Sequence, residues 1–162
     1  MRQKVPIGVL LSGSGTNLQA LIRACDRPDF PARIAVVISN KKSAFGLQRA
    51  KEAGIPCQWL PARPHPSREA HEQVITEALE KHAVEWVACA GYMRLLGPQF
   101  VDHWKHRVLN IHPALLPAFP GVDSQRQAFD HGVQIAGVTV HLVNEGCDTG
   151  PILAQAATGL RP

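Results

Sequence analysis

An asparagine and a histidine are separated by one residue in the segment Asn110-Ile111-His112, which ends an apolar run that favours a strand over residues 108–111. Side chains alternate between the two faces of a strand, so Asn110 and His112 share one face, about 6.5–7 Å apart. An amide donor beside an imidazole suits the stabilisation of an oxyanion that forms on a carbonyl group. The alternative is a purely structural histidine, and the other seven histidines are interpreted that way. They are His65, His71, His82, His103, His106, His131 and His141, the last as a partly buried spacer in a strand.

The segment from Asn144 to Gly150 follows another predicted strand and is rich in turn-forming residues. It carries two acids, Glu145 and Asp148. A carboxylate near an imidazole fixes the orientation of the ring and favours its protonated form. The same residues also fit a solvated surface turn in which Asp148 makes only local hydrogen bonds, and the residues alone leave both interpretations open.

A glycine-rich loop, Ser12-Gly13-Ser14-Gly15-Thr16-Asn17, follows the first predicted strand and opens a helix. Such a loop lets the backbone approach an anion, and the free N–H groups of the helix start point at it. The dinucleotide pattern G-x-G-x-x-G is absent because position 18 is leucine, and the G-x-x-x-x-G-K-[ST] phosphate loop is absent too. A single phosphate group is therefore the expected ligand, against the alternative of a tight turn without a ligand.

The segment Met93-Arg94-Leu95-Leu96 follows the fourth predicted strand, where main-chain groups and apolar side chains can form a slot for a flat ring. Ordinary core packing is the alternative. The four cysteines are far apart and form no CxxC pair, and no HExxH or GxSxG motif is present. We therefore expect no metal, and a reducing cytoplasmic location.

The composition limits the class of protein. The chain has 162 residues, 45% of them hydrophobic and 19% charged, which predicts one folded domain rather than a disordered or fibrous chain. No apolar run approaches the roughly 18 residues that a membrane span needs. The net charge of 17 − 13 = +4 is not gathered into a block and aromatic residues are few, so we expect a small anionic substrate and no nucleic acid.

Short β-branched runs alternate with segments of helical spacing along the whole chain. Strands are predicted at residues 5–11, 34–38, 55–60, 84–90, 108–111, 137–143 and 151–156, and helices at 18–25, 44–53, 69–82, 98–106 and 124–131. This alternation predicts the α/β class, with an open, mostly parallel sheet and helices on both faces. Ligands of such sheets bind at the carboxyl ends of the strands. The Asn-x-His motif, the acidic loop, the glycine-rich loop and the segment 93–96 each lie at the end of a predicted strand.

Together these segments resemble one family. SGSGTNLQALI, NKKSAFGLQRAKEAGIP, GYMRLL, LNIHPALLPAFPG and HLVNEGCDTGPILAQA are similar to the glycinamide ribonucleotide formyltransferases over about residues 5–156. The resemblance implies a Rossmann-like fold and transfer of a formyl group from 10-formyltetrahydrofolate to the amine of glycinamide ribonucleotide, in de novo purine biosynthesis. A homodimer is considered as the assembly.

The resemblance also assigns residues. It implies that the catalytic residues are Asn110, His112 and Asp148, that the phosphate-binding residues are Gly15, Thr16 and Asn17, and that the folate-binding residues are Arg68, Met93, Arg94, Leu95, Leu96, Asn110, Asn144, Glu145, Gly146, Cys147 and Asp148. In these roles a protonated His112 donates to the oxyanion and Asn110 gives a second hydrogen bond. Asp148 keeps His112 protonated and helps to order a water that moves a proton.

The chain departs from the family pattern in two places. Asp123 stands where the family often has histidine, and Ala114 stands where many members have serine. In addition, the family normally continues past the AQAA segment with a strand and a long helix. We therefore expect residues 1–162 to be a single formyltransferase domain without that strand and helix.

Three alternatives remain. Formyltetrahydrofolate deformylase shares the scaffold but usually has His-Ser where this chain has Pro113-Ala114, and it usually carries an N-terminal regulatory domain. Methionyl-tRNA formyltransferase, another folate-dependent enzyme, adds a basic C-terminal domain for tRNA. The third alternative is a folate- or nucleotide-binding remnant without turnover. A formyl-transfer assay separates them.

Overall fold

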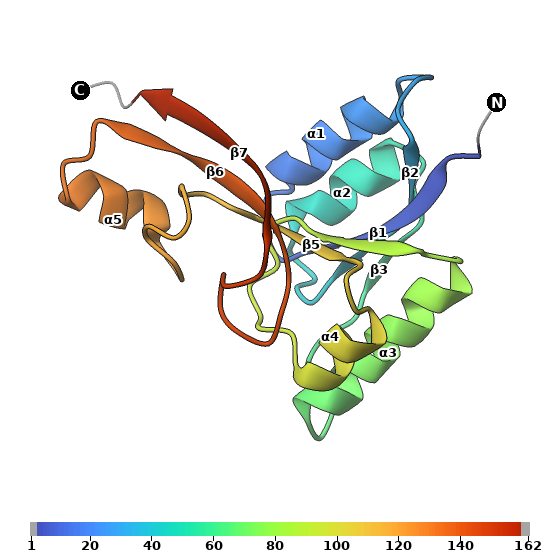
Figure 1. The fold of residues 1–162 in the computed structure, drawn as a ribbon. Helices are drawn as coiled ribbons and strands as arrows, with labels where there is room; N and C mark the ends of the chain where they lie inside the picture. The colour runs from blue at the N-terminus through green and yellow to red at the C-terminus, as the bar shows by residue number, and fades with distance from the viewer. Residues whose placement is uncertain (1–2, 160–162) are drawn as a thin grey trace. The chain divides into compact units, whose positions relative to one another are not determined.

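The chain folds into two compact units, which meet in sequence between Val108 and Leu109. A computed structural model describes residues 3–159 (Figure 1). Within these residues no helix is long and apolar enough to cross a membrane. The expectations of one domain over residues 1–162 and of an absent C-terminal strand and helix stay predictions.

The first unit is built on a parallel sheet. Its strands are β1 (Val5–Leu11), β2 (Ala32–Ser39), β3 (Cys57–Trp59) and β4 (Trp86–Cys89). They lie in the order β3-β2-β1-β4, and each neighbouring pair is parallel. This is the open parallel sheet that the strand–helix alternation predicts, because parallel neighbours need crossover connections.

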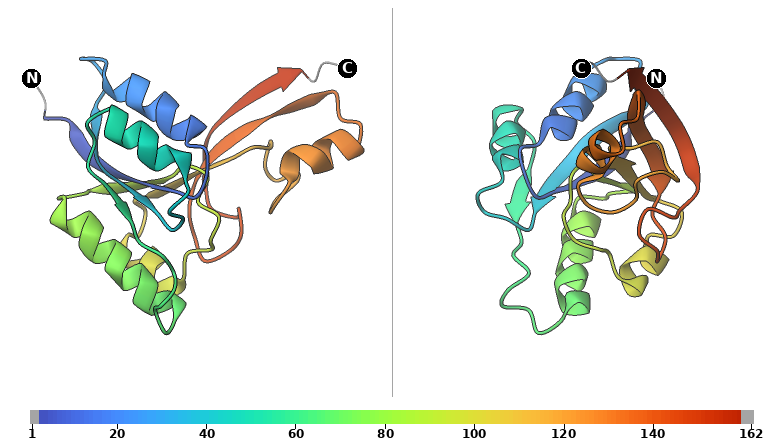
Figure 2. Two further views of the ribbon diagram at one scale, coloured as in Figure 1. Left: turned by 180° about the vertical axis from the view of Figure 1, so that it is seen from behind. Right: turned by 90° about the vertical axis from the view of Figure 1, so that its left-hand side faces the viewer.

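Four helices cover the two faces of this sheet. They are α1 (Thr16–Cys25), α2 (Phe45–Glu52), α3 (Arg68–Lys81) and α4 (Pro98–His103). The views from the front and from behind agree that α1 and α2 lie on one face, with α3 and α4 on the opposite face (Figures 1 and 2). The prediction of an α/β unit with helices on both faces is confirmed.

The ends of two helices follow from local sequence. Ser67 caps α3, because its hydroxyl oxygen accepts the backbone N–H of Ala70 at 3.1 Å. Pro98 occupies the first turn of α4, as predicted. The predicted end of α4 at His106 is wrong: the helix ends at His103, and His106 has a φ of 60°, which no regular right-handed helix contains.

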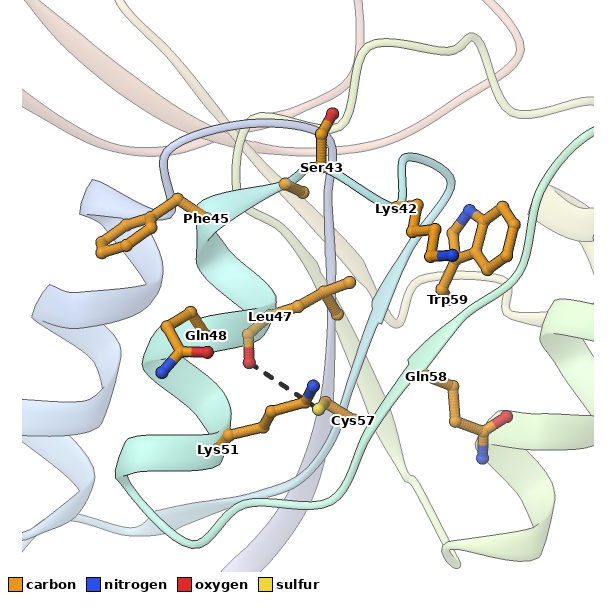
Figure 3. A pocket seen from close by; sticks show the side chains of 10 residues that line it. Lys42, Ser43, Phe45, Leu47, Gln48, Lys51, Cys57, Gln58 and Trp59 are labelled. Carbon is orange, nitrogen blue, oxygen red and sulfur yellow. Dashed lines mark hydrogen bonds between the residues drawn. The ribbon is translucent and has the colours of Figure 1, made fainter.

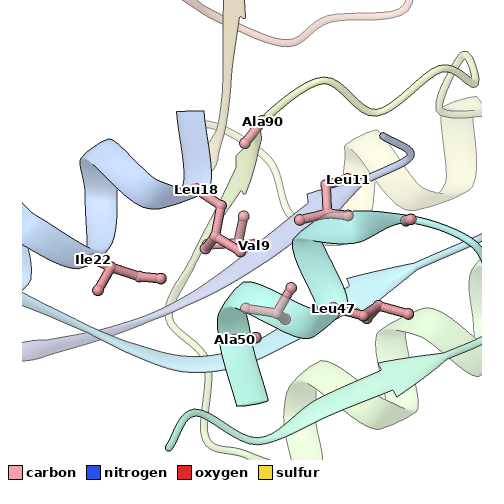
Figure 4. Close-up of a cluster of buried hydrophobic side chains, with 9 residues drawn as sticks. Val9, Leu11, Leu18, Ile22, Leu47, Ala50 and Ala90 are labelled. Carbon is pink, nitrogen blue, oxygen red and sulfur yellow. The ribbon is translucent and has the colours of Figure 1, made fainter. Parts of the chain in front are cut away.

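The core of the first unit lies between β1, β2 and the helices α1 and α2. Val9, Leu11, Leu18 and Val37 are completely buried there, and Ala50 of α2 packs with them (Figure 4). Burying each of the larger side chains contributes about 1.5–3 kcal/mol. This packing fixes the carboxyl end of β1 and therefore the glycine-rich loop that follows it.

The second unit is an antiparallel sheet with one helix. Strand β5 (Val108–His112), which begins at the boundary, pairs with β6 (Ile135–Leu142), and β6 pairs with β7 (Ile152–Gly159). Helix α5 (Ser124–Asp130) connects β5 to β6. A parallel sheet does not continue through these strands. The segment between β6 and β7 is too short for a crossover, so β7 returns antiparallel.

Candidate active site

Strand β5 carries both residues of the Asn-x-His motif. His112 is 4% exposed, and Asn110 is half-buried. In the antiparallel register Asn110 lies opposite His141 and His112 lies opposite Thr139. Alternation along β5 places Asn110 and His112 on one face, as the sequence predicts.

The loop after β6 brings an acid to this face. Asp148 has a φ of 54°, in the left-handed region that aspartate tolerates better than most residues. Gly150 is required beside it, because a Cβ at that position would overlap the carbonyl oxygen of Leu142. The resulting close turn places Asp148 Oδ2 3.3 Å from His112 Nδ1. The backbone N–H of Gly121 donates to the same Oδ2 at 2.8 Å.

Both ring nitrogens of His112 face hydrogen-bond acceptors. Nδ1 faces the carboxylate of Asp148, and Nε2 lies 2.8 Å from the carbonyl oxygen of Phe119. A carbonyl oxygen accepts hydrogen bonds and donates none, so Nε2 carries a proton in its contact with Phe119. Nδ1 forms an ion pair with the carboxylate of Asp148 when it is protonated as well. The side chains of His112 and Asp148 are only 5% and 11% exposed, so water screens their attraction weakly.

The interpretation of His141 as a partly buried spacer is wrong. Its side chain is buried, and its Nε2 lies 3.2 Å from Asn110 Nδ2 and 3.6 Å from Asp148 Oδ1. Its Nδ1 lies 2.9 Å from the carbonyl oxygen of Leu142, so Nδ1 is the protonated nitrogen. Nε2 is then free to accept from the amide of Asn110. His141 therefore contacts two of the three predicted catalytic residues.

The loop that follows His112 is held by Thr139. The hydroxyl of Thr139 donates to the carbonyl oxygen of Ala114 at 2.7 Å and accepts the N–H of Leu116 at 3.0 Å. Gln155 of β7 adds hydrogen bonds to Thr139 Oγ1 and to the carbonyl oxygen of Leu116. Ala114 is buried, and Asp123, the other departure from the family pattern, has a φ of 54° at the start of α5.

The exposed tip of the acidic loop holds the other predicted residues of the second unit. Asn144 Oδ1 accepts the N–H of Gly146 at 3.0 Å and the hydroxyl of Thr149 at 2.8 Å. Glu145 and Cys147 are exposed beside them. Partial burial and the negative charge of Asp148 raise the pKa of the Cys147 thiol. The loop is therefore internally ordered, and its thiol is not activated.

In the first unit, a side chain of α2 forms a hydrogen bond to the glycine-rich loop. Gly15 precedes α1 with a φ of 73°, and no side chain caps the helix start. Thr16 and Asn17 form the first turn, with N–H groups that a helix leaves without backbone partners. The guanidinium of Arg49 donates to the carbonyl oxygen of Ser14 at 2.9 Å. Sequence reasoning missed this cation, which lies 35 residues along the chain from the loop.

The predicted folate segment of the first unit is irregular and exposed. Met93 and Leu95 are 68% and 65% exposed, so core packing does not explain these two residues. The N–H of Met93 donates to Ser12 Oγ at 2.9 Å, which ties this segment to the glycine-rich loop. Arg68 lies at the first turn of α3, with 41% of its side chain exposed. The segment therefore presents apolar side chains to solvent, and their role in folate binding stays a prediction.

A separate cavity of about 510 Å³ lies between α2 and β3 (Figure 3). Lys42 and Trp59 line it, with Lys42 Nζ 5.3 Å from the centre of the Trp59 ring. None of the predicted site residues lines this cavity. Among the described residues, no three histidine, cysteine, aspartate or glutamate side chains are grouped as a metal site.

Comparison with known proteins identifies the class. The family described as Formyl transferase matches residues 5–162, and the chain belongs to this family. Phosphoribosylglycinamide formyltransferase of Escherichia coli is 45% identical over 93% of the chain and 71% of that protein. The enzyme of the same name from Bacillus subtilis is 43% identical over 92% of the chain and 76% of its own length.

Longer relatives and solved structures agree. The trifunctional purine biosynthetic protein adenosine-3 of Drosophila pseudoobscura is 46% identical, and the chain spans 12% of its length. The crystal structure of glycinamide ribonucleotide transformylase 1 from Symbiobacterium toebii has a TM-score of 0.95 and 48% identity, over 98% of this chain and 75% of that one. The expected family and its α/β fold are confirmed.

Proposed function

We propose that this chain transfers the formyl group of 10-formyltetrahydrofolate to the amine of glycinamide ribonucleotide, a step of de novo purine biosynthesis in the cytoplasm. The observation that carries the proposal is the buried pair that Asp148, from the loop after β6, forms with His112, which lies on the strand that also bears Asn110. The names and identities of the relatives support the same reaction.

The reaction begins when the amine of the ribonucleotide attacks the formyl carbon. A carbon–nitrogen bond forms, and the carbonyl oxygen becomes an oxyanion. In the free protein the Nε2–H of His112 donates to the Phe119 carbonyl. During the reaction it donates to the oxyanion instead. The amide of Asn110 gives a second hydrogen bond. Charge-assisted donors placed before the reaction stabilise such an intermediate strongly.

Asp148 acts through His112. Its carboxylate holds Nδ1 and balances the charge of the imidazolium, so the donating nitrogen stays oriented and protonated. When the intermediate collapses, the bond between the formyl carbon and the folate nitrogen breaks. The proton lost by the attacking amine passes to that nitrogen through a water that Asp148 helps to order. Atoms and charge balance without a metal.

The substrate-binding residues follow the family pattern. In the first unit, the N–H groups of Gly15, Thr16 and Asn17 bind the phosphate of the ribonucleotide. Arg68 and the segment Met93–Leu96 bind folate, with the guanidinium suited to the carboxylates of its glutamate moiety. In the second unit, Asn110 and the loop 144–148 also bind folate.

A formyl-transfer assay tests the proposal by following folate absorbance with and without glycinamide ribonucleotide. We expect turnover that requires the ribonucleotide. Deformylation without it would instead show a deformylase, and formylation of methionyl-tRNA the other transferase. Absence of any turnover, with folate binding retained, would show a binding remnant. Sedimentation of the same preparation determines whether the chain forms a homodimer.

A further inference from the structure

The carboxylate of Glu72 is buried next to Arg68 and has no role in the proposed reaction. Glu72, one turn along α3, is 4% exposed. Its Oε1 accepts the backbone N–H of Gly97 at 2.9 Å, and its Oε2 is buried without a hydrogen-bond partner among residues 3–159. Burying a carboxylate is unfavourable unless its charge is paired, so this position needs an explanation.

Satisfying the N–H of Gly97 does not require a charge, because a glutamine would accept the same hydrogen bond. What the negative charge adds is its attraction for the guanidinium of Arg68, whose Nε lies 3.9 Å from Glu72 Oε1. A second carboxylate, Glu69, lies 3.6 Å from Arg68 Nη2 but is exposed. Exposed pairs are weak, whereas the field of a buried carboxylate is little screened.

Gly97 completes the contact. A Cβ at Gly97 would lie 2.9 Å from Arg68 Nε and 2.9 Å from Glu72 Oε2, so the guanidinium and the carboxylate both rest against its Cα. Its φ of −78° is accessible to any residue. Glycine is therefore needed at this position because a side chain would not fit, not because of the backbone conformation. Gly97 also directly follows the predicted folate segment Met93–Leu96.

We propose that Glu72, with Gly97, is a positioning residue that aims the guanidinium of Arg68 at the carboxylates of the folate glutamate moiety. This inference rests on the proposed function, because it takes Arg68 to be a folate-binding residue. Glu72 itself touches no substrate. Its effect is therefore selective: it matters for ligands that carry the carboxylates and not for the same ring system without them.

The test compares two probes by calorimetry, tetrahydrofolate and the primary amide of tetrahydropteroic acid, which keeps the benzoyl amide of folate and lacks the glutamate carboxylates. Glu72→Gln keeps the hydrogen bond from Gly97 and removes the charge. We expect it to lower affinity for tetrahydrofolate roughly threefold to tenfold and to leave binding of the tetrahydropteroic acid amide unchanged. Glu69→Gln is the matched control and should bind both probes as the parent chain does.

Arg68→Ala should remove the discrimination between the two probes, and adding Glu72→Gln to it should cause no further loss. Gly97→Ala should reproduce the selective loss by displacing the guanidinium. Equal losses for both probes in Glu72→Gln would show a general structural role and overturn the proposal, as would no loss at all. Unchanged discrimination in Arg68→Ala would instead show that the folate role of Arg68 is wrong, while formyl transfer could still be measured.

Discussion

Asp148 Oδ2 lies 3.3 Å from His112 Nδ1, and both side chains are almost completely buried. The carboxylate also accepts the N–H of Gly121, so it is fixed before any ligand arrives. The Phe119 carbonyl accepts a hydrogen bond from the other ring nitrogen, so the ring of His112 is oriented from both sides. This arrangement requires no reorientation of Asp148 during the reaction, and substitutions of Asp148, His112 and His141 test it.

Replacing Asp148 by asparagine should lower formyl transfer roughly 100-fold, the lower part of the range for a general acid. Asparagine tolerates the left-handed backbone at this position, so the fold should persist. Nitrogen-15 spectra of the imidazole at neutral pH should show that His112 has lost its doubly protonated form. A ring in the same state in both proteins would contradict the coupling.

Replacing His112 by alanine should reduce turnover about 10²–10³-fold, the usual cost of one oxyanion donor. Folate binding, measured by calorimetry, should largely persist. His103→Ala is a suitable control, because His103 lies on the surface and pairs only with the exposed Glu80 among the described residues. Turnover close to that of the parent chain would refute the assignment of His112.

His141→Ala should lower kcat about tenfold, equivalent to 1.4 kcal/mol, by releasing Asn110 and Asp148. It should also lower the free energy of unfolding by about 1–3 kcal/mol, because partners of His141 lose their hydrogen bonds. His141→Gln restores a polar atom near Nε2 and should recover part of kcat. Equal kcat in the two variants would show that contact with Nε2 is unimportant.

Gly15→Ala should destabilise the fold by about 1–3 kcal/mol and weaken phosphate binding at residues 15–17. Its φ is 73°, and a Cβ would lie 2.6 Å from the Cα of Gly46. Gly13→Ala is the matched control for stability, since its Cβ would meet no atom of the described part of the chain within 4 Å. Urea unfolding and a phosphate titration of backbone amide shifts measure the two effects. A Gly15→Ala protein as stable as Gly13→Ala would contradict the expectation.

The stability of Glu72→Gln should depend on pH less than that of the parent chain. Burial raises the pKa of Glu72, although the Gly97 N–H, Arg68 and Arg94 oppose the shift and Glu69 adds to it. Below the ordinary value of 4.5 the carboxyl is protonated in the folded and unfolded states alike. As the pH rises through the folded pKa, only the folded state bears the cost of a buried charge, so the parent loses stability relative to the variant.

Urea unfolding at a series of pH values measures how the free energy of unfolding of each protein changes with pH. Glu69→Gln should differ in the opposite direction, because hydrogen bonds at the start of α3 lower the pKa of Glu69. For a lowered pKa the stabilisation is present at neutral pH and is lost as the pH falls. Parallel pH curves for the parent and Glu72→Gln would contradict the raised pKa of Glu72.

Local sequence determined most of the elements and much of the candidate site. The alternation of β-branched and amphipathic segments predicted the parallel unit, since periodicity depends only on which face of each element is buried. The glycine-rich loop before α1, the cap at Ser67 and the shared face of Asn110 and His112 follow from neighbours along the chain. The resemblance to a family then supplied Arg68 and chose the catalytic interpretation of the acidic loop, which the residues alone had left open.

Tertiary structure alone decided which distant side chains meet. His141 contacts Asn110 because β6 pairs antiparallel to β5 in one register, and a shift of one residue would turn it to the other face. Arg49 reaches the glycine-rich loop only through the packing of α2. In the sequence, Glu72 looks like any other polar helix residue. Its carboxylate meets the N–H of Gly97 only because the chain folds back to α3 at that glycine. Sequence periodicity does not predict these side-chain contacts. They depend on how separate elements pack against one another, whereas periodicity depends on the order of residues within one element.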